Sequence, residues 1–350
     1  MSKDVPRDHL ELSEVGFGAG VFSGNYDKFE GSWSVEACKE ALKSVHCLLL
    51  PSFRHVPGIN LFDTSPYYGR SEFILGDALH SLVDEFPRSR YYISTKVGRY
   101  GYYAREFDYS VARVTASVEE SLRRLHTDYI DIVFCHDVEF VPFDNVVGEG
   151  GALEALCKLK AEGKIGYVGC SGYPLPVLLK IAEHQHAKNQ PLDIILSYCN
   201  YTIQNTILSR FSPLFRAAGV RYILNASPLA MGLFRPMGPP DWHPAHAELR
   251  EAARQAAAVA SDAGFDIAKL ASQYAFGARE SIGVDCTVIG LGKKEEVQEA
   301  VKTWTEVKER EKGVVAARKE EGRVMRDISV LLAPYLDYTW ESPTKKEREG

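Results

Sequence analysis

Short apolar runs alternate with longer amphipathic segments about eight times along this chain, and this alternation restricts the fold more than any other feature. The runs at 129–135 and 192–198 are almost entirely hydrophobic, which predicts strands buried on both faces. The segments between such runs, for example 110–125, place apolar residues near the helical period. Repeated strand-helix units of this kind predict a closed (β/α)8 TIM barrel with a parallel sheet.

A doubly wound sheet is the alternative, and it predicts a Gly-x-Gly-x-x-Gly turn after an early strand. The glycines at 16–20 lack the last spacing, which counts against a Rossmann domain. We expect residues 1–340 to form a single barrel domain and the charged residues 341–350 to form a disordered tail. The segment 48–57 fits neither period, so we expect a loop or an insertion there.

Residues that can cap a helix precede several of the amphipathic segments. Ser34, Ser110 and Asp266 are the expected N-caps of three helices. A last helix is expected over 321–335, packed outside the barrel.

Composition excludes several classes of partner. The chain has 350 residues, and its net charge of −6 gives no reason to expect nucleic acid or an anionic membrane. No apolar run approaches the length of a membrane span, and the N-terminus lacks the apolar core of a signal peptide.

The seven cysteines have no metal-site or CxxC spacing and are expected to be reduced core residues of a cytoplasmic protein. We expect no metal and a monomer or weak homodimer.

An acid, a lysine and a histidine stand at the ends of three successive predicted strands. They are Asp63, Lys96 and His136, and Tyr68 follows Asp63 in the same loop. The carboxyl ends of barrel strands meet at one face, so these side chains are expected to converge. A buried ammonium favours the phenolate of a tyrosine, and a buried lysine needs a carboxylate partner. This set suits proton transfer at an alcohol or carbonyl oxygen.

Each of these residues alone has a structural explanation. Asp63 could cap a turn, Lys96 could end a strand in solvent, and His136 and Tyr68 could be packing residues. Their joint placement at successive strand ends favours a catalytic site.

The motifs around these residues resemble the aldo-keto reductase family. The resemblance rests on 63–69 with 71–72 and 75–76, and continues through 94–96, 128–136, 164–171, 226–233 and 288–290. It implies a barrel that binds extended NAD(P)(H) without a Rossmann domain. It also implies that Tyr68 is the general acid/base, that Lys96 lowers the Tyr68 pKa, that Asp63 pairs with Lys96, and that His136 orients the substrate oxygen.

The resemblance also implies a set of cofactor-binding residues. Ser171 is expected at the nicotinamide carboxamide. The pyrophosphate is expected along Ser227, Leu229 and Gly232, and the adenosine phosphate along Gly290, Gly292 and Lys293. Three positions depart from the family pattern. Gly172 replaces an Asn, Ser197 replaces a Gln that contacts the cofactor, and Asn200, followed by Tyr201, replaces a Tyr.

The segments 62–69, 195–201 and 226–233 resemble a sugar-oxidising branch of the family. That resemblance implies an aldose 1-dehydrogenase that forms an aldonolactone from D-arabinose. L-galactose oxidation, NADPH-dependent aldehyde reduction and a non-catalytic, cofactor-binding regulatory subunit are the alternatives.

The adenosine loop bears on the choice of cofactor. Lys293 and Lys294 suit the extra phosphate of NADP, whereas Glu296 would repel that phosphate or bind a free ribose hydroxyl. We expect NAD, with NADP as the alternative. Trp33 and Tyr67 are expected to stack on the sugar, and Trp242 could do so or could close the rim.

Overall fold

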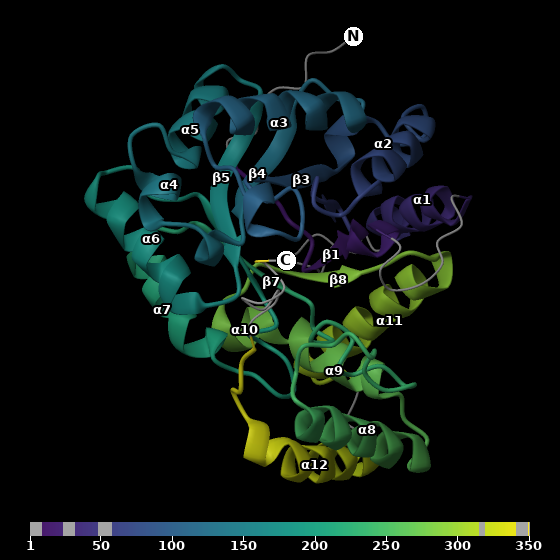
Figure 1. Ribbon diagram of the computed structural model, residues 1–350. Helices are drawn as coiled ribbons and strands as arrows, with labels where there is room; N and C mark the ends of the chain where they lie inside the picture. The colour runs from purple at the N-terminus through teal and green to yellow at the C-terminus, as the bar shows by residue number, and fades with distance from the viewer. Residues whose placement is uncertain (1–8, 24–31, 48–57, 315–318, 341–348, 350) are drawn as a thin grey trace.

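Eight parallel strands close into a barrel in the computed structural model, which describes residues 9–23, 32–47, 58–314, 319–340 and 349. Each strand pairs with the next in sequence, and β8 pairs with β1 (Figure 1). The strands are β1 (Val15–Gly18), β2 (Leu61–Asp63), β3 (Tyr92–Val97), β4 (Ile130–His136), β5 (Ile165–Gly172), β6 (Ile194–Tyr198), β7 (Tyr222–Ala226) and β8 (Cys286–Gly290). The predicted TIM barrel is confirmed, and the doubly wound alternative is excluded.

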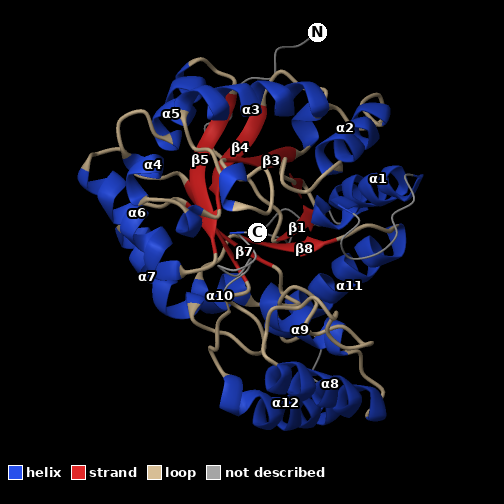
Figure 2. Ribbon diagram, viewed as in Figure 1, coloured by secondary structure: helices blue, strands red, loops and turns tan. Residues whose placement is uncertain are grey.

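Helices surround the barrel (Figure 2). They are α1 (Ser32–Cys47), α2 (Ser71–Ser81), α3 (Val111–Arg124), α4 (Phe143–Val147), α5 (Ala152–Ala161), α6 (Leu175–Ala187), α7 (Leu208–Ala217), α8 (Ala247–Asp262), α9 (Ile267–Phe276), α10 (Ala278–Ile282), α11 (Lys294–Glu311) and α12 (Lys319–Leu332). The short helices α4 and α10 were not predicted. The last helix, α12, lies beside α8 outside the ring, as Figure 1 shows.

Two of the three predicted helix caps are confirmed. The Ser110 hydroxyl accepts a hydrogen bond from the backbone of Arg113, and the Asp266 carboxylate accepts one from Ala268. Ser34 does not cap α1, because that helix already begins at Ser32. The predicted loop at 48–57 and most of the predicted tail lie outside the described residues. The extent of the single domain therefore stays a prediction.

The N-terminal end of the barrel is closed by the segment that precedes β1. Leu10 and Leu12 are buried among the side chains that fill the barrel interior. The backbone of Leu10 donates a hydrogen bond to the Tyr222 hydroxyl, and the backbone of Glu11 donates one to the Tyr92 hydroxyl. Only the opposite end, where the carboxyl ends of the strands lie, is left for a site.

The family motif at 71–76 binds α2 to its neighbours. The Glu72 carboxylate is buried and accepts hydrogen bonds from Thr95 of β3 at 2.6 Å and Ser121 of α3 at 2.7 Å. Gly76 lies against the backbone of Arg124, so close that a Cβ there would collide with the carbonyl oxygen. These contacts fix β3, which carries Lys96, against its covering helices.

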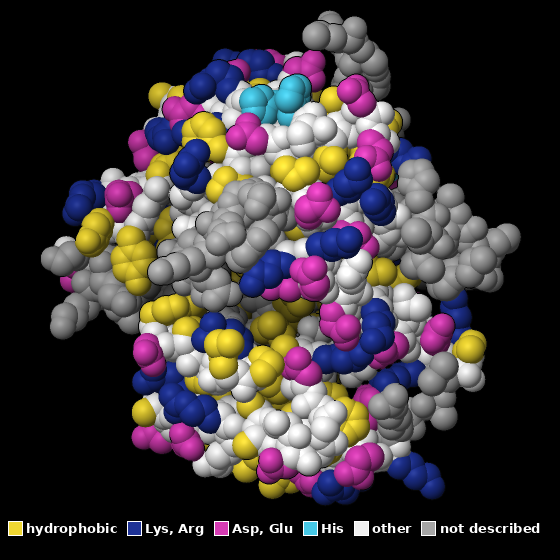
Figure 3. All heavy atoms as spheres, turned by 90° about the vertical axis from the view of Figure 1, so that its right-hand side faces the viewer, with side chains coloured by type: hydrophobic (Ala, Val, Ile, Leu, Met, Phe, Trp, Pro, Cys, Tyr) yellow, Lys and Arg dark blue, Asp and Glu magenta, His cyan; other side chains and the backbone are white. Residues whose placement is uncertain are grey.

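The charge distribution on the surface and the burial of the cysteines can be compared with the sequence expectations. Figure 3 shows acidic and basic side chains interspersed over the face that carries α1, α2 and α11. The six cysteines whose side chains are described are free thiols, and all but Cys157 are buried. The expectation of a core position is therefore wrong for Cys157. Among the described residues, no helix has the length and apolarity to span a membrane.

Candidate active site

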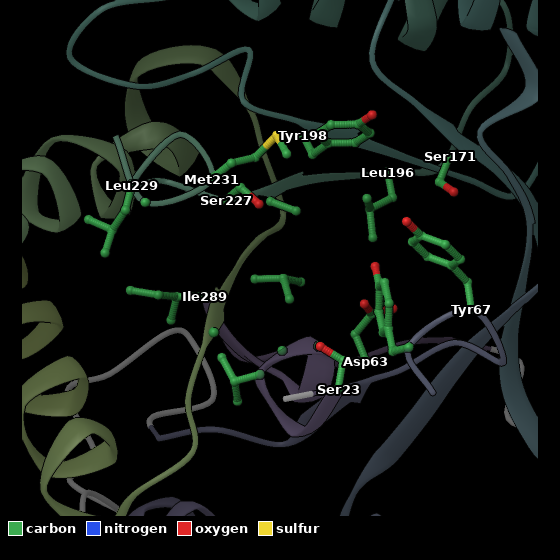
Figure 4. A pocket seen from close by; sticks show the side chains of 18 of the residues that line it. Ser23, Asp63, Tyr67, Ser171, Leu196, Tyr198, Ser227, Leu229, Met231 and Ile289 are labelled. Carbon is green, nitrogen blue, oxygen red and sulfur yellow. The ribbon is translucent and has the colours of Figure 1, made fainter. Parts of the chain in front are cut away.

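A cavity of about 650 Å³ opens at the carboxyl ends of the barrel strands. Figure 4 shows Asp63, Tyr67 and Ser171 on one side of it and Ser227, Leu229 and Met231 across from them. All four predicted catalytic residues line this cavity: Asp63, Tyr68, Lys96 and His136. The predicted convergence of strand ends is therefore present in the structure.

Asp63 and Lys96 form an ion pair that is almost closed to solvent. The Lys96 Nζ lies 2.6 Å from Asp63 Oδ2 and donates a second hydrogen bond to the Thr64 carbonyl at 2.8 Å. Asp63 is in register with Ser94, whose hydroxyl donates to Asp63 Oδ1 at 2.6 Å. Ser94 and Lys96 are two residues apart on β3, so they face the same side. The pairing expected from the sequence is present.

Tyr68 lies beside this pair in a buried position. The Lys96 Nζ is 5.0 Å from the centroid of the Tyr68 ring. Burial nevertheless raises the pKa of Tyr68 well above its ordinary value, and the charges of Asp63 and Asp137 raise it further. Burial disfavours the phenolate and sets the direction of the net shift, and the expected effect of Lys96 on the Tyr68 pKa stays a prediction. Tyr68 is therefore a protonated phenol in this structure.

His136 is neutral, and its surroundings assign the tautomer. Burial, opposed by the Asp137 charge and assisted by Lys96 and Arg99, lowers the pKa of His136 to about 3. The Ser65 hydroxyl accepts a hydrogen bond from the backbone of Tyr67 and lies 3.1 Å from His136 Nδ1, and we assign its own proton to that nitrogen because Nε2 faces the acceptor-only Asp137 carboxylate. The ring proton then belongs on Nε2, which is 3.5 Å from the Asp137 carboxylate. A neutral Nε2–H suits a hydrogen bond to a substrate oxygen.

A second ion pair lies next to the catalytic residues. Arg99 donates to Asp137 Oδ2, and both side chains are buried and line the cavity. The Arg99 guanidinium stacks 3.7 Å from the centroid of the Tyr67 ring. Tyr67, predicted as a substrate residue, lines the cavity too. Trp33, the other predicted substrate residue, lies in α1, but its side chain is outside the described residues.

Five of the predicted cofactor residues line the cavity: Ser171, Ser227, Leu229, Gly232 and Gly290. Ser171 is in register with His136, which brings the predicted carboxamide contact next to the catalytic histidine. A Cβ at Gly290 would lie only 2.9 Å from a methyl carbon of Val21. The glycine lets the end of β8 approach the loop after β1, and this approach forms one wall of the cavity.

The remaining cofactor predictions fall outside the cavity lining. Ser197 is fully buried, and its hydroxyl accepts a hydrogen bond from the Asn200 amide at 3.0 Å. Successive side chains of a strand point to opposite faces, so Leu196 and Tyr198 line the cavity and Ser197 does not. Ser197 thus lies behind the cavity wall, and its contact with a cofactor stays a prediction. Tyr201 stacks on Tyr274 instead of facing the cavity.

Gly292, Lys293 and Glu296 lie at the start of α11 and do not line the cavity. The Glu296 carboxylate accepts hydrogen bonds from the backbone nitrogens of Gly292 at 2.7 Å and Lys293 at 3.1 Å. This cap fixes a negative charge at the adenosine loop that the sequence predicts.

The departure at Gly172 has a physical reason. A Cβ at this position would lie 2.5 Å from Glu139 Oε2. The Glu139 carboxyl accepts a hydrogen bond from the Tyr173 backbone through its other oxygen. Burial, with the Asp137 charge, raises the pKa of Glu139 to about 8. Glu139 thus occupies the space that an Asn side chain at 172 would need.

The loop after β7 is strained where it borders the cavity. Ser227, Ala230 and Met231 have φ angles of 56°, 49° and 58°, which non-glycine residues adopt at a cost of about 1–2 kcal/mol each. Such strain clusters at ligand-binding segments. Arg235 of the same loop lines the cavity, and its Nε donates a hydrogen bond to the Gly238 carbonyl at 3.2 Å. Its charge is available to an anionic group in the cavity.

Sequence reasoning missed Ser65, Arg99 and Asp137, and it placed Tyr198 at a strand end without giving it a role. Asp137 directly follows His136, and Arg99 follows β3 after Gly98, so the rule that used strand ends could have found both. Tyr198 is the last residue of β6 and was accessible by the same rule. Ser65 gave no signal beyond its place in a Ser-Pro turn.

Comparison with known proteins gives the family. The profile of the Aldo/keto reductase family matches residues 52–314. An L-galactose dehydrogenase from Arabidopsis thaliana is 36% identical over 335 residues, which is 95% of this chain and 94% of that protein. A D-arabinose 1-dehydrogenase from Saccharomyces cerevisiae is 43% identical over 261 residues, which is 73% of this chain and 75% of that protein.

A solved structure agrees in fold. The holo form of an aldo-keto reductase from Bacillus halodurans superposes with a TM-score of 0.62, at 22% identity, over 99% of both chains. The chain therefore belongs to the Aldo/keto reductase family and is an oxidoreductase of that family.

Proposed function

We propose that this protein is an NAD-dependent aldose 1-dehydrogenase that oxidises D-arabinose at C1 to an aldonolactone. The observation that carries the proposal is that one cavity is lined by all four of the residues expected to catalyse, namely Asp63, Lys96, Tyr68 and His136. The relatives named as D-arabinose and L-galactose dehydrogenases support a sugar as the substrate. Oxidation of L-galactose is the second candidate, because the relative with that name aligns over almost the whole chain.

The site residues have distinct roles in this reaction. The neutral His136 donates a hydrogen bond from Nε2 to the C1 oxygen and holds it next to the Tyr68 hydroxyl. In its deprotonated form the Tyr68 oxygen takes the proton of the C1 hydroxyl while the C1–H bond gives up a hydride, so the carbon is oxidised by two electrons. The charges of Asp63 and Lys96 determine the electrostatic environment of the Tyr68 hydroxyl. A bound oxidised nicotinamide would supply the acceptor for the hydride.

The high pKa of Tyr68 affects the two directions differently. A protonated phenol is ready to act as the acid in carbonyl reduction. It must first lose its proton to act as the base in alcohol oxidation. Reduction of aldehydes is therefore a feasible reverse activity of the same residues.

The cavity suits a nicotinamide cofactor. Gly290 and Val21, which lie close together, form one wall of the cavity. Arg235 also lines the cavity, and its positive charge could balance the negative charge of a pyrophosphate. Ser171 stands beside His136, where a carboxamide would bind near the reacting carbon. The choice of NAD over NADP rests on the fixed Glu296 carboxylate, which would repel a ribose phosphate.

A sugar panel tests the proposal. Formation of reduced cofactor should be measured with D-arabinose, L-galactose, L-fucose and D-glucose, each with NAD and with NADP. We expect the highest kcat/KM for D-arabinose with NAD. NADPH-driven aldehyde reduction with no sugar oxidation would overturn the dehydrogenase proposal. A higher kcat/KM for L-galactose would select the second candidate. The cytoplasmic location and the oligomeric state stay predictions.

A further inference from the structure

We propose that Asp137, held by Arg99, is the residue that selects the substrate by binding the hydroxyl on the carbon next to the reacting one. This inference rests on the proposed aldose dehydrogenase function and deepens it. The catalytic residues alone would treat a sugar and a simple aldehyde alike, because they contact only the reacting oxygen. Asp137 adds a contact that a simple aldehyde cannot make.

The first observation is an incomplete set of hydrogen bonds. Asp137 lines the cavity and is 2% exposed. Its Oδ2 accepts from Arg99, but its Oδ1 is buried and has no hydrogen-bond partner among the described residues. A buried carboxylate oxygen without a donor is destabilising. A donor that enters the cavity would satisfy it, and the second torsion of an aspartate turns readily enough to meet one.

The second observation is backbone strain at the same residue. Asp137 has a φ of 52° and a ψ of 54°, the left-handed conformation that non-glycine residues rarely adopt. The strain places the carboxylate directly after His136, with its Oδ2 3.5 Å from His136 Nε2. Strained residues of this kind are concentrated in ligand clamps and active sites.

Arg99 makes this position specific. Its guanidinium is buried between the Asp137 carboxylate and the Tyr67 ring, 3.7 Å from the ring centroid. It therefore holds Oδ2 of Asp137, the oxygen that also lies 3.5 Å from His136 Nε2, while Oδ1 is buried without a partner among the described residues. Tyr67, Arg99 and Asp137 follow β2, β3 and β4, so rigid strands position this part of the site.

The geometry points to a particular hydroxyl. His136 Nε2 holds the reacting oxygen, and the Asp137 carboxylate is its immediate neighbour. The two oxygens of a vicinal diol are roughly one hydrogen-bond length apart, about 2.8 Å. An aldose that places its C1 oxygen on His136 can therefore present its C2 hydroxyl to Asp137. The carboxylate accepts this hydrogen bond, and the hydroxyl donates it.

The test combines a protein variant with a substrate variant. D-arabinose and 2-deoxy-D-ribose, which is the same sugar without its C2 hydroxyl, should be compared in the wild type and in Asp137→Asn. L-galactose and its 2-deoxy analogue replace them if that sugar is the better substrate. We expect the wild type to prefer the parent sugar by about 10- to 100-fold in kcat/KM, mainly through KM. Asp137→Asn should abolish most of that preference, because it should lower kcat/KM for the parent sugar more than for the deoxy sugar.

Asp144→Asn is the matched control, because Asp144 is exposed and does not line the cavity. It should keep the wild-type preference. Calorimetry should show the same loss of parent-sugar binding to the Asp137→Asn protein in the presence of cofactor. Equal losses for the parent and deoxy sugars in Asp137→Asn would show that Asp137 only supports the fold, and would overturn the inference.

Two further outcomes keep the two proposals distinguishable. If Asp137→Asn does not fold, the inference is tested on the wild type alone, by its preference for the parent sugar over the deoxy sugar. A preference below about threefold for the parent over the deoxy sugar overturns the role of Asp137 and leaves the dehydrogenase function intact. If the wild type oxidises no aldose at all, the proposed function fails and the inference fails with it.

Discussion

The ammonium of Lys96 lies 2.6 Å from the carboxylate of Asp63 in a site where both side chains are almost completely buried. Neither charge can be removed alone without leaving the other unpaired in a poorly solvated environment. The pair therefore has a structural role in addition to any role in catalysis, and the two roles can be separated by experiment.

Replacing one member of this pair should lower both stability and activity. We expect Lys96→Met to lower the free energy of unfolding by about 3–5 kcal/mol, because Asp63 is left as an uncompensated buried charge. The double variant Asp63→Asn, Lys96→Met should recover much of the stability and stay inactive. Denaturant unfolding and turnover measure the two effects. Recovery of activity together with stability would show that the pair serves the fold alone.

Removing the Tyr68 hydroxyl should separate chemistry from cofactor binding. We expect Tyr68→Phe to lower kcat by roughly 10²–10⁴-fold, because the proton carrier is lost. Cofactor affinity, measured by quenching of intrinsic fluorescence, should stay close to that of the wild type. Tyr338→Phe removes the same atom from an exposed tyrosine and is the control. Sugar oxidation at the wild-type rate in Tyr68→Phe would contradict the assignment.

The rate of sugar oxidation should rise with pH. Burial raises the pKa of Tyr68, and oxidation needs the unprotonated base, so the active fraction grows as the pH increases above neutral. Carbonyl reduction needs the protonated acid, so its rate should stay level or fall over the same range. Initial rates of oxidation and of reduction, measured over a range of pH in several buffers at constant ionic strength, test this prediction. Parallel profiles in the two directions would contradict it.

Glu139 should make the fold less stable as the pH rises. Its pKa is about 8 in the folded protein against an ordinary value of 4.5, so the folded state retains a proton that the unfolded chain has lost. The stabilisation is complete below about pH 4.5 and is lost as the pH increases through 8, by an amount on the order of 5 kcal/mol.

Glu139→Gln mimics the protonated form and should flatten this dependence, so that the variant gains stability over the wild type at alkaline pH. Thermal unfolding between mildly acidic and alkaline pH measures the effect. Glu149→Gln, at an exposed position, is the control and should follow the wild-type profile. A Glu139→Gln profile as steep as that of the wild type would show that Glu139 is ionised in the fold.

Glu296 should determine part of the cofactor preference. Glu296→Gln keeps an oxygen that can accept the hydrogen bonds of Gly292 and Lys293 and removes the charge. We expect kcat/KM with NADP to increase about tenfold, with little change for NAD, because one repulsive charge near a phosphate is gone. Glu295→Gln, at the exposed neighbouring position, should leave the ratio unchanged. If the ratio of kcat/KM with NADP to kcat/KM with NAD is unchanged in Glu296→Gln, the 2′-phosphate of the adenosine ribose does not bind near Glu296.

The sequence by itself determined the architecture and the four residues expected to catalyse. The apolar runs recur with local periods, and a parallel barrel places every strand end at one face, so Asp63, Lys96 and His136 could be brought together without coordinates. Short helices such as α4 could not be predicted in the same way, because a few residues carry too little periodic signal.

Only the tertiary structure decided which neighbours surround those residues. The side of β6 that faces the cavity is set by strand register, which turns Ser197 away and brings Tyr198 in. The space beside Gly172 is filled by Glu139, which comes from a different strand-helix unit. The pairing of Arg99 with Asp137 and the high pKa of Tyr68 likewise depend on burial and on contacts between distant segments. Local sequence patterns contain no information about such contacts, because they form only when the barrel closes.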